Sequence, residues 1–385
     1  MASVGVWSET NTTRVAIAAD LRVPESDRAD QSKSVVKTSY RHKLLPFGSI
    51  EAGVEVLALQ QTVDRVFPFG SDGTQQQTGE GVAAAPFVDI RYRISQLQLQ
   101  AGWRSTVWMG WLGNRVSAEP RVAAHYALSA RSSVGVDYGI STQAPSPYEA
   151  AIRPREVRQW SAFWHFLPNE HIKWSWQVYQ QQLYHLAGEG TLSALNQWET
   201  LQSSMQATGR GRTRGMELSL QRFAGTGWWY VLSGSLLDAR YQDANDQWQH
   251  TRFSHGFASA LTIGKEWHGM DKKGTANRLG INTSLQWRGG LRTLPILLEA
   301  SRTARTTVFD YDATFAQQLP DYFRMDLRVY YQKNHEGWNS MLSLDIQNAT
   351  GYQNTAYQYY DRLLDAVQTR YQLEFIPIIS YRVNF

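Results

Sequence analysis

The 385-residue sequence contains no cysteine, which excludes disulfide bridges and thiolate metal sites. It also contains no apolar run approaching the about eighteen residues that a membrane-spanning helix requires, and WWYVL at 228–232 is typical of its short runs. The first residues, MASVGVWSET, lack the basic and apolar segments of a secretory signal. We therefore expect either that the chain is not exported or that its natural N-terminus lies upstream of this sequence.

Motifs of catalysis and metal binding are also missing. The nine histidines are scattered without a His-Glu-x-x-His motif, and no Gly-x-Ser-x-Gly occurs. The glycines of GRGRTRG at 209–215 precede an expected strand, whereas a phosphate loop precedes a helix. Asp310 and Asp312 could contribute to a calcium site, although lone acids in a polar loop are usually solvated. We therefore expect a protein that is not an enzyme, with no catalytic residues, no metal site and no cofactor.

Charge is sparse and evenly spread, whereas aromatic residues are abundant. The 38 basic and 34 acidic residues form no basic tract, so we expect no nucleic-acid partner. Charged residues make up 19% of the chain and aromatic residues 12%, with fifteen tryptophans and nineteen tyrosines. This combination is typical of a surface that meets lipid through aromatic girdles.

The hydrophobic pattern predicts strands almost throughout, with no convincing amphipathic helix. We count about sixteen segments of roughly ten or more residues, the length of a tilted strand that crosses a bilayer. In YFRMDLRVYYQ, Phe323, Met325, Leu327, Val329 and Tyr331 alternate with polar residues. These polar residues are Arg324, Asp326 and Arg328, and we expect them to form part of a polar lumen wall.

Short turns alternate with long polar loops, which is the pattern of outer-membrane barrels. Only helices and closed barrels satisfy every backbone polar group inside lipid. Because the hydropathy excludes membrane helices, a membrane location requires an antiparallel transmembrane β-barrel. We find no internal domain boundary and treat residues 1–385 as one barrel portion.

Tryptophans recur in pairs on one face of an expected strand. Trp160 and Trp164 form one such pair, and Trp174 and Trp176 form another. A membrane-interface belt explains these pairs more simply than a platform for stacking carbohydrate, although both remain open.

The chain ends on RYQLEFIPIISYRVNF, which predicts one long strand of sixteen residues. By parity, one face of this strand is apolar and aromatic. That face includes Phe375, Tyr381, Val383 and the terminal Phe385.

Several stretches resemble the barrel of TonB-dependent outer-membrane receptors, most closely those of Bacteroidetes-type bacteria. The stretch AEPRVAAHYALSARSSVGVDYGISTQAPSPYE is similar to a turn, two strands and a loop entry of that family, and GRGRTRGMELSLQR to its Gly-x-Glu-Leu strand. The late strands QQLPDYFRMDLRVYYQKN and LSLDIQNATGYQN place Asp326, Asp345, Asn348 and Asn354 at its recurring polar positions. The ending FIPIISYRVNF resembles its final strand.

This resemblance implies a fold, a location and a set of partners. The expected fold is all-β, about 16 strands of a barrel of roughly 22, without the N-terminal plug and TonB-contacting segment of the family. The location is the outer membrane of a Gram-negative bacterium, in contact with lipid. The resemblance implies that the barrel-assembly machinery recognises the chain end, here Phe375, Tyr381, Val383 and Phe385. TonB acts only through the missing N-terminal part. The ligand is a small, scarce nutrient such as an iron chelate, a vitamin or a glycan, and a surface lipoprotein could cap the barrel.

Two other functions stay open at this point. A complete, smaller barrel of about sixteen strands would act as a passive outer-membrane channel. A soluble, β-rich carbohydrate-binding protein or enzyme would use its tryptophans as stacking platforms. The missing signal peptide and the order of the receptor-like stretches favour the TonB-dependent receptor.

Overall fold

The protein is built around one large antiparallel sheet. The computed structural model describes residues 2–17, 25–44, 46–66, 74–110, 114–144, 153–188, 206–223, 227–242, 246–271, 274–310, 313 and 315–385. Within these residues seventeen strands join in the large sheet, and two further hairpins and one short helix complete the fold. The expectation of an all-β fold is therefore confirmed, apart from one short helix.

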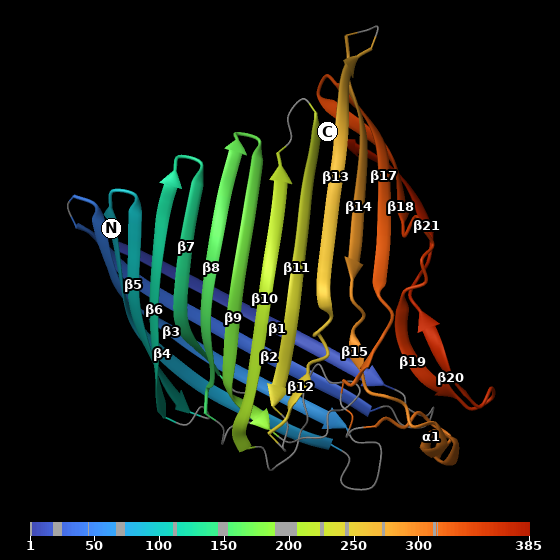
Figure 1. Ribbon diagram of the computed structural model, residues 1–385, viewed down its shortest axis with the longest axis horizontal. Helices are drawn as coiled ribbons and strands as arrows, with labels where there is room; N and C mark the ends of the chain where they lie inside the picture. The colour runs from blue at the N-terminus through green and yellow to red at the C-terminus, as the bar shows by residue number, and fades with distance from the viewer. Residues whose placement is uncertain are drawn as a thin grey trace.

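The long strands of the sheet follow one another in chain order, and each pairs antiparallel with the next long strand (Figure 1). One of the seventeen, β12 (Trp248–His250), has three residues and pairs only with β11, which leaves sixteen strands, the number expected. These sixteen strands are β1 (Ala2–Ile17), β2 (Glu25–Leu44), β3 (Gly48–Val66), β4 (Thr74–Ile94), β5 (Leu97–Gly110), β6 (Arg115–Ser129), β7 (Ser132–Gln143), β8 (Arg155–Asn169), β9 (Ile172–Gly188), β10 (Gln206–Arg222), β11 (Trp228–Gln242), β13 (Gly256–Met270), β14 (Ala276–Arg288), β17 (Tyr322–His335), β18 (Trp338–Gln347) and β21 (Ile376–Asn384).

The two ends of the strands differ in their connections. Tight turns such as 95–96, 130–131 and 336–337 lie at one end, together with the C-terminus, at the top of Figure 1. We call this the turn end. The opposite loop end carries the long connections, which contain α1 (Leu298–Ala304), the hairpin of β15 (Arg292–Thr293) and β16 (Gln317–Gln318), and the hairpin of β19 (Thr355–Asp361) and β20 (Ala366–Tyr371). The sequence analysis missed α1, because seven residues form too short a helix to give a periodic pattern.

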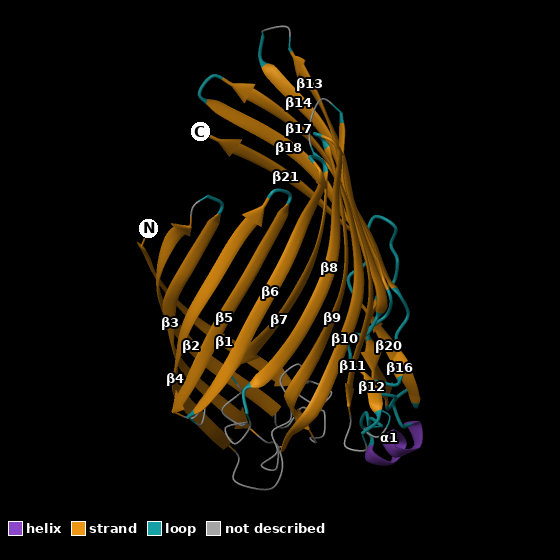
Figure 2. Cartoon of the chain, turned by 60° about the vertical axis from the view of Figure 1, so that its left-hand side comes forward, coloured by secondary structure: helices purple, strands orange, loops and turns teal. Residues whose placement is uncertain are grey.

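The sheet curves strongly and stays open between β1 and β21, for which the described residues show no mutual pairing (Figure 2). In its register, residues that oppose each other on neighbouring strands point to the same face of the sheet. Tyr331, Leu342 and Tyr381 follow one another on one face, which we call the outer face. Ser343 and Tyr330 oppose each other on the other, inner face and are buried, although the described residues provide no second layer over them. Burial without a covering layer is expected on the concave side of a curved sheet, so the inner face is the concave one.

The end of the chain differs from the prediction of one sixteen-residue strand. Residues 366–371 form β20, which pairs with β19, and residues 372–375 link this hairpin to β21. The backbone N–H of Gln372 donates to the carbonyl oxygen of Asn354 at 2.8 Å, which holds the chain away from the sheet before β21 begins. Phe375 therefore lies outside the final strand. Within β21, Pro377 opposes Ile346 of β18.

Glycines on the inner face receive aromatic rings from the neighbouring strand. In each of five pairs the glycine and the aromatic residue are directly opposed, and a Cβ added to the glycine would collide with the ring. The pairs are Gly53 with Phe87, Gly135 with Phe163, Gly215 with Tyr179, Gly264 with Trp229, and Gly280 with Tyr330. The missing side chain makes room for each ring, so these pairs join adjacent strands.

Replacing Gly280 with alanine tests this packing. The ring of Tyr330 cannot move aside freely, because it is buried and its hydroxyl donates to Glu266 Oε1. We expect Gly280→Ala to lower the free energy of unfolding by about 1–3 kcal/mol, as overpacking usually does. Denaturant titration in detergent micelles measures this change. Gly234→Ala is the matched control, since its Cβ would meet no atom within 4 Å, and equal stabilities of the two variants would contradict the prediction.

Candidate functional site

The outer face carries a row of exposed aromatic side chains along the turn end. Each comes from a different strand, and each lies close to the end of its strand at the short turns. The row consists of Tyr40, Tyr92, Tyr126, Trp164, Trp174, Trp228, Trp267, Tyr331 and Tyr381. Tryptophan and tyrosine in this arrangement form the girdle that outer-membrane barrels place at a membrane interface.

A second group of aromatic residues lies on the outer face towards the loop end. The rings of Phe257 and Trp287 meet edge to face at 4.9 Å between centroids, and Trp287 opposes Phe323 on β17. On β13, Phe257 and Trp267 are ten positions apart (267 − 257), and Leu261 and Ile263 face outward between them. At roughly 3.3 Å per residue and a tilt of about 45°, ten residues span about 23 Å. This height matches the roughly 25 Å apolar band of outer-membrane barrels.

The two predicted tryptophan pairs lie on the outer face. Trp164 opposes Trp176 across β8 and β9, and Trp174 opposes Phe166, whose ring stacks on Trp164 at 5.7 Å. Trp160 lies farther along β8 on the same face. Their same-face arrangement is confirmed, and they extend the aromatic surface next to the turn at 170–171.

The inner face carries charged side chains that neutralise one another across strands. Arg104 Nη2 lies 3.1 Å from Glu55 Oε1, and its Nε lies 3.7 Å from Glu119 Oε2. The hydroxyls of Thr106 and Thr142 donate to Glu119 Oε1 at 2.7 and 2.6 Å. Paired charges of this kind leave a wall that is hydrophilic without a strong net charge.

The three residues predicted for a polar lumen wall continue this pattern on β17. Arg324 Nε donates to Asp326 Oδ1 at 2.7 Å, and Arg328 Nε lies 3.4 Å from Asp345 Oδ1 on β18. All three side chains are half-buried, and Arg328 shares the inner face with Asn282 on β14. Their contact with an aqueous lumen stays a prediction.

Two buried asparagines close the loop end of β17 and β18. Asn354 is 3% exposed, and its amide bonds both backbone groups of Phe323, with Oδ1 accepting from N–H and Nδ2 donating to C=O, each at 2.8 Å. The backbone N–H of Asn348 donates to Asp326 Oδ1 at 2.8 Å, and Asn348 Nδ2 donates to the carbonyl oxygen of Tyr352 at 2.9 Å. Asn348 has φ +48°, a left-handed conformation that asparagine adopts more readily than most residues. Three of the four polar positions that carried the family resemblance, Asp326, Asn348 and Asn354, therefore fix the point where strands turn into the connection.

The predicted assembly residues divide between two places. Tyr381 and Val383 lie on the outer face of β21, opposite Leu342 and Ser340, and Phe385 is fully exposed at the turn end. Phe375 is 53% exposed at the loop end, a whole strand away. Recognition by an assembly machinery stays a prediction, and the structure groups only the three terminal residues.

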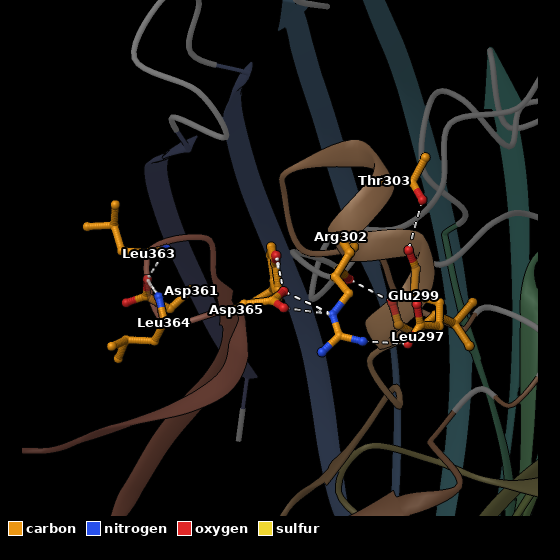
Figure 3. A network of polar contacts seen from close by, with 10 residues as sticks. Leu297, Glu299, Arg302, Thr303, Asp361, Leu363, Leu364 and Asp365 are labelled. Atoms are coloured by element: carbon orange, nitrogen blue, oxygen red, sulfur yellow. Dashed lines mark hydrogen bonds and ion pairs between the residues drawn. The ribbon is translucent and has the colours of Figure 1, made fainter.

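At the loop end, an ion-pair network ties α1 to the hairpin of β19 and β20 (Figure 3). Arg302 Nε donates to Asp365 Oδ1 at 2.9 Å, and Arg302 Nη1 donates to Glu299 Oε1 at 2.6 Å. The hydroxyl of Tyr360 donates to Asp365 Oδ1 at 2.8 Å. The hydrogen bond from Arg302, followed by that from Tyr360, lowers the pKa of Asp365 below its ordinary value. The sequence analysis missed this network, because its members are sixty-three positions apart and the chain between them is irregular.

The described residues offer no alternative metal or helical site. They contain no group of three or more possible metal ligands, and Asp312, one of the two acids considered for calcium, lies outside the described residues. Asp310 accepts the backbone N–H of Ala313 at 3.2 Å. No helix in the described part of the chain is long and apolar enough to cross a membrane.

Comparison with known proteins identifies the family. Residues 8–349 match the family model described as TonB dependent receptor-like, beta-barrel. The chain therefore belongs to this family, which confirms the resemblance drawn from the sequence, whereas the closer likeness to Bacteroidetes-type receptors stays a prediction. No curated protein matches the chain.

Solved receptor structures share the fold. The ferripyoverdine receptor of the outer membrane of Pseudomonas aeruginosa is 11% identical with a TM-score of 0.64, over 99% of this chain and 53% of the receptor. The ferric citrate transporter FecA is 12% identical with a TM-score of 0.66, over 99% and 58%. The ferric yersiniabactin uptake receptor FyuA from Yersinia pestis is 11% identical with a TM-score of 0.62, over 100% and 59%. This chain thus spans a little more than half the length of these receptors, and the likeness shows the fold alone.

Asn354→Ala tests the asparagine that closes β17. The change leaves the N–H and C=O of Phe323 without their side-chain partner, and such loss costs about 1–3 kcal/mol when the groups are buried. We expect a fall of this size in the free energy of unfolding measured in micelles. The neighbouring Gln353→Ala is the control, because Gln353 is exposed and bonds only Glu374. A loss in Asn354→Ala no greater than in this control would refute the capping role.

The network at Asp365 predicts a pH-dependent contact between α1 and the hairpin. The pKa of Asp365 is lowered in the folded protein. Ionised Asp365 therefore stabilises the contact between α1 and the hairpin fully at any pH above the pKa of about 3.9 that the side chain has in the unfolded chain. The contribution is lost as the pH falls through the lower, folded value. Because the chain lacks cysteine, spin labels can be attached uniquely at Thr303→Cys and Leu363→Cys, and their distance should lengthen only in strong acid. Asp365→Asn should give the long distance already at neutral pH, and a short distance in that variant would contradict the assignment.

Proposed function

We propose that the chain forms part of the wall of a TonB-dependent receptor in the outer membrane of a Gram-negative bacterium. The observation that carries this proposal is the outer face, on which aromatic groups lie about 23 Å apart with Leu261 and Ile263 between them, opposite an inner face of paired charges. Residues 1–385 contribute a single barrel portion. The turn end faces the periplasm and the loop end faces outward, as in barrels with short periplasmic turns.

The transported compound is a scarce nutrient, and a ferric chelate is the class that we favour over a vitamin or a glycan. Similar structures support this choice, because they include receptors for ferripyoverdine, ferric preacinetobactin and ferric yersiniabactin. Energy coupling involves TonB through a part of the receptor outside these residues. Lipid contacts the outer face, the barrel-assembly machinery recognises the chain end, and a surface lipoprotein could cover the loop end.

Uptake measurements test this function. A strain that lacks the gene should lose accumulation of one labelled compound from a panel of ferric chelates, vitamins and glycans, and the intact gene should restore it. Removal of TonB should abolish the same uptake. Uptake that survives without TonB would instead support a passive channel, and absence of the protein from outer-membrane fractions would support a soluble protein.

The chain end gives a prediction about assembly. Tyr381 and Phe385 are exposed on the outer face and at the terminus, where they bond no other side chain among the described residues. We expect the double variant Tyr381→Ser with Phe385→Ser to lower the amount of folded protein in the outer membrane at least fivefold, while the folded fraction keeps its ligand affinity. The amount is measured by heat-modifiable mobility in membrane fractions.

The matched control replaces two exposed aromatic residues at the loop end, Phe253→Ser and Tyr371→Ser. This control should assemble normally, because it leaves the chain end intact. Normal assembly of the terminal double variant would refute the role given to Tyr381 and Phe385.

A further inference from the structure

A lysine on the outer face lies between two tryptophan rings at the turn end. Lys265 on β13 opposes Trp228 on β11, and Trp267 follows two positions later on the same face. The Nζ atom of Lys265 lies 5.3 Å from the centre of the Trp228 ring and 5.2 Å from that of the Trp267 ring. Ile281 opposes Lys265 from β14, so apolar and aromatic side chains surround the ammonium group. A positive charge is therefore held at the level of the aromatic row.

No carboxylate of the described residues neutralises this charge. Within the described chain, Lys265 forms no hydrogen bond or ion pair through its ammonium group. By contrast, Lys333 on the same face has its Nζ atom 3.2 Å from Asp271 Oδ2. Attraction to aromatic rings offsets only part of the hydration that a cation loses among apolar groups. Lys265 thus keeps a positive charge that a partner outside the described chain can neutralise.

Arg222 brings a second positive charge to the same place. It is the last residue of β10, opposes Tyr230 on the outer face and is exposed. A Cβ added to Gly227 would lie 3.7 Å from Arg222 Nη2, so the guanidinium group reaches the turn that leads into Trp228. This group forms no ion pair with any described residue. Arg222 and Lys265 therefore flank Trp228 from β10 and β13, two strands that lie about 10 Å apart at the usual spacing.

A phospholipid headgroup has the chemistry that this arrangement lacks. Its phosphodiester carries one negative charge, and its free oxygens accept hydrogen bonds from ammonium and guanidinium groups. Tryptophan rings lie at the headgroup level of a membrane. From there, acyl chains would continue along Ile263 and Leu261, which face outward on β13 towards the middle of the apolar band. An anionic lipid suits two cations better than a zwitterionic lipid, whose own cation they would repel.

We propose that Arg222 and Lys265 bind the phosphate of an anionic phospholipid of the phosphatidylglycerol type at the turn end. Trp228 and Trp267 hold the ammonium group of Lys265 in place for this contact. The proposal rests on the proposed outer-membrane location and goes beyond the transport function, because it assigns a lipid site to the outer face.

Native mass spectrometry of the full receptor, purified in detergent and delipidated, tests the site. Phosphatidylglycerol and phosphatidylethanolamine with the same acyl chains are titrated separately. Phosphatidylglycerol should bind saturably and more tightly than phosphatidylethanolamine. Lys265→Gln should weaken its binding about tenfold, the loss expected for one charge-assisted hydrogen bond. Lys265→Arg should keep most of the affinity, because a guanidinium group retains the charge beside the rings.

Lys333→Gln is the matched control, because it removes the same charge from the same face and end of the sheet, but from a lysine that Asp271 already neutralises. Its affinity for phosphatidylglycerol should equal that of the unmodified receptor. Arg222→Gln repeats the test at an exposed position, where the substitution leaves the packing of the rings unchanged. Equal affinities of Lys265→Gln, Arg222→Gln and Lys333→Gln, or equal binding of the two lipids by the unmodified receptor, would overturn the proposal.

Inorganic phosphate separates a lipid site from a site for free anions. It should not displace bound phosphatidylglycerol, because it has no acyl chains to contact the outer face, and displacement by phosphate would overturn the assignment to a lipid. The site and the proposed function can fail separately. Absence of the protein from outer-membrane fractions would refute the function, whereas a receptor with TonB-dependent uptake that binds both lipids equally would refute the site alone.

Discussion

The two-residue period of side chains along the strands is the constraint on which the rest of this structure depends. The register of the sixteen strands keeps directly opposed residues on the same face of the sheet. Tyr331, Leu342 and Tyr381 therefore lie on one face, and Arg328 and Asp345 lie on the other. A slip of one residue between two neighbours would reverse every side chain beyond it. The inner glycine and aromatic pairs oppose such a slip, because each ring fits only against the strand position that lacks a Cβ.

Open edges follow from the same architecture. In these residues β1 and β21 each keep one side without a ladder partner, and an unpaired strand edge cannot persist within lipid. In the membrane location that we propose, each edge therefore requires a partner strand. The similar receptors, which are nearly twice as long as this chain, are compatible with such a completion.

The sequence predicted those elements whose pattern is local. The alternation in YFRMDLRVYYQ identified β17 and both of its faces, because a half-buried strand must show it. The final strand was predicted too long, since the pairing of 366–371 with β19 and the bond from Gln372 to Asn354 depend on partners elsewhere in the chain. Likewise, Arg222 and Lys265 lie on different strands, and only the register of β11 between them shows that they flank Trp228. Their proximity was therefore beyond sequence analysis, while the faces of the sheet were within it.

Arginine serves two electrostatic roles in this protein, and the difference separates the wall from the loop end. On the inner face, Arg104, Arg121 and Arg328 each lie within 4 Å of a carboxylate oxygen on another strand of the sheet. A wall of such pairs presents hydrogen-bonding groups to a passing solute without holding it by charge. At the loop end, Arg252, Arg288 and Arg292 are oriented by carbonyl oxygens and an aromatic ring, or by no described side chain. The same side chain is therefore neutralised by carboxylates along the wall, whereas carbonyl oxygens and an aromatic ring orient it at the loop end.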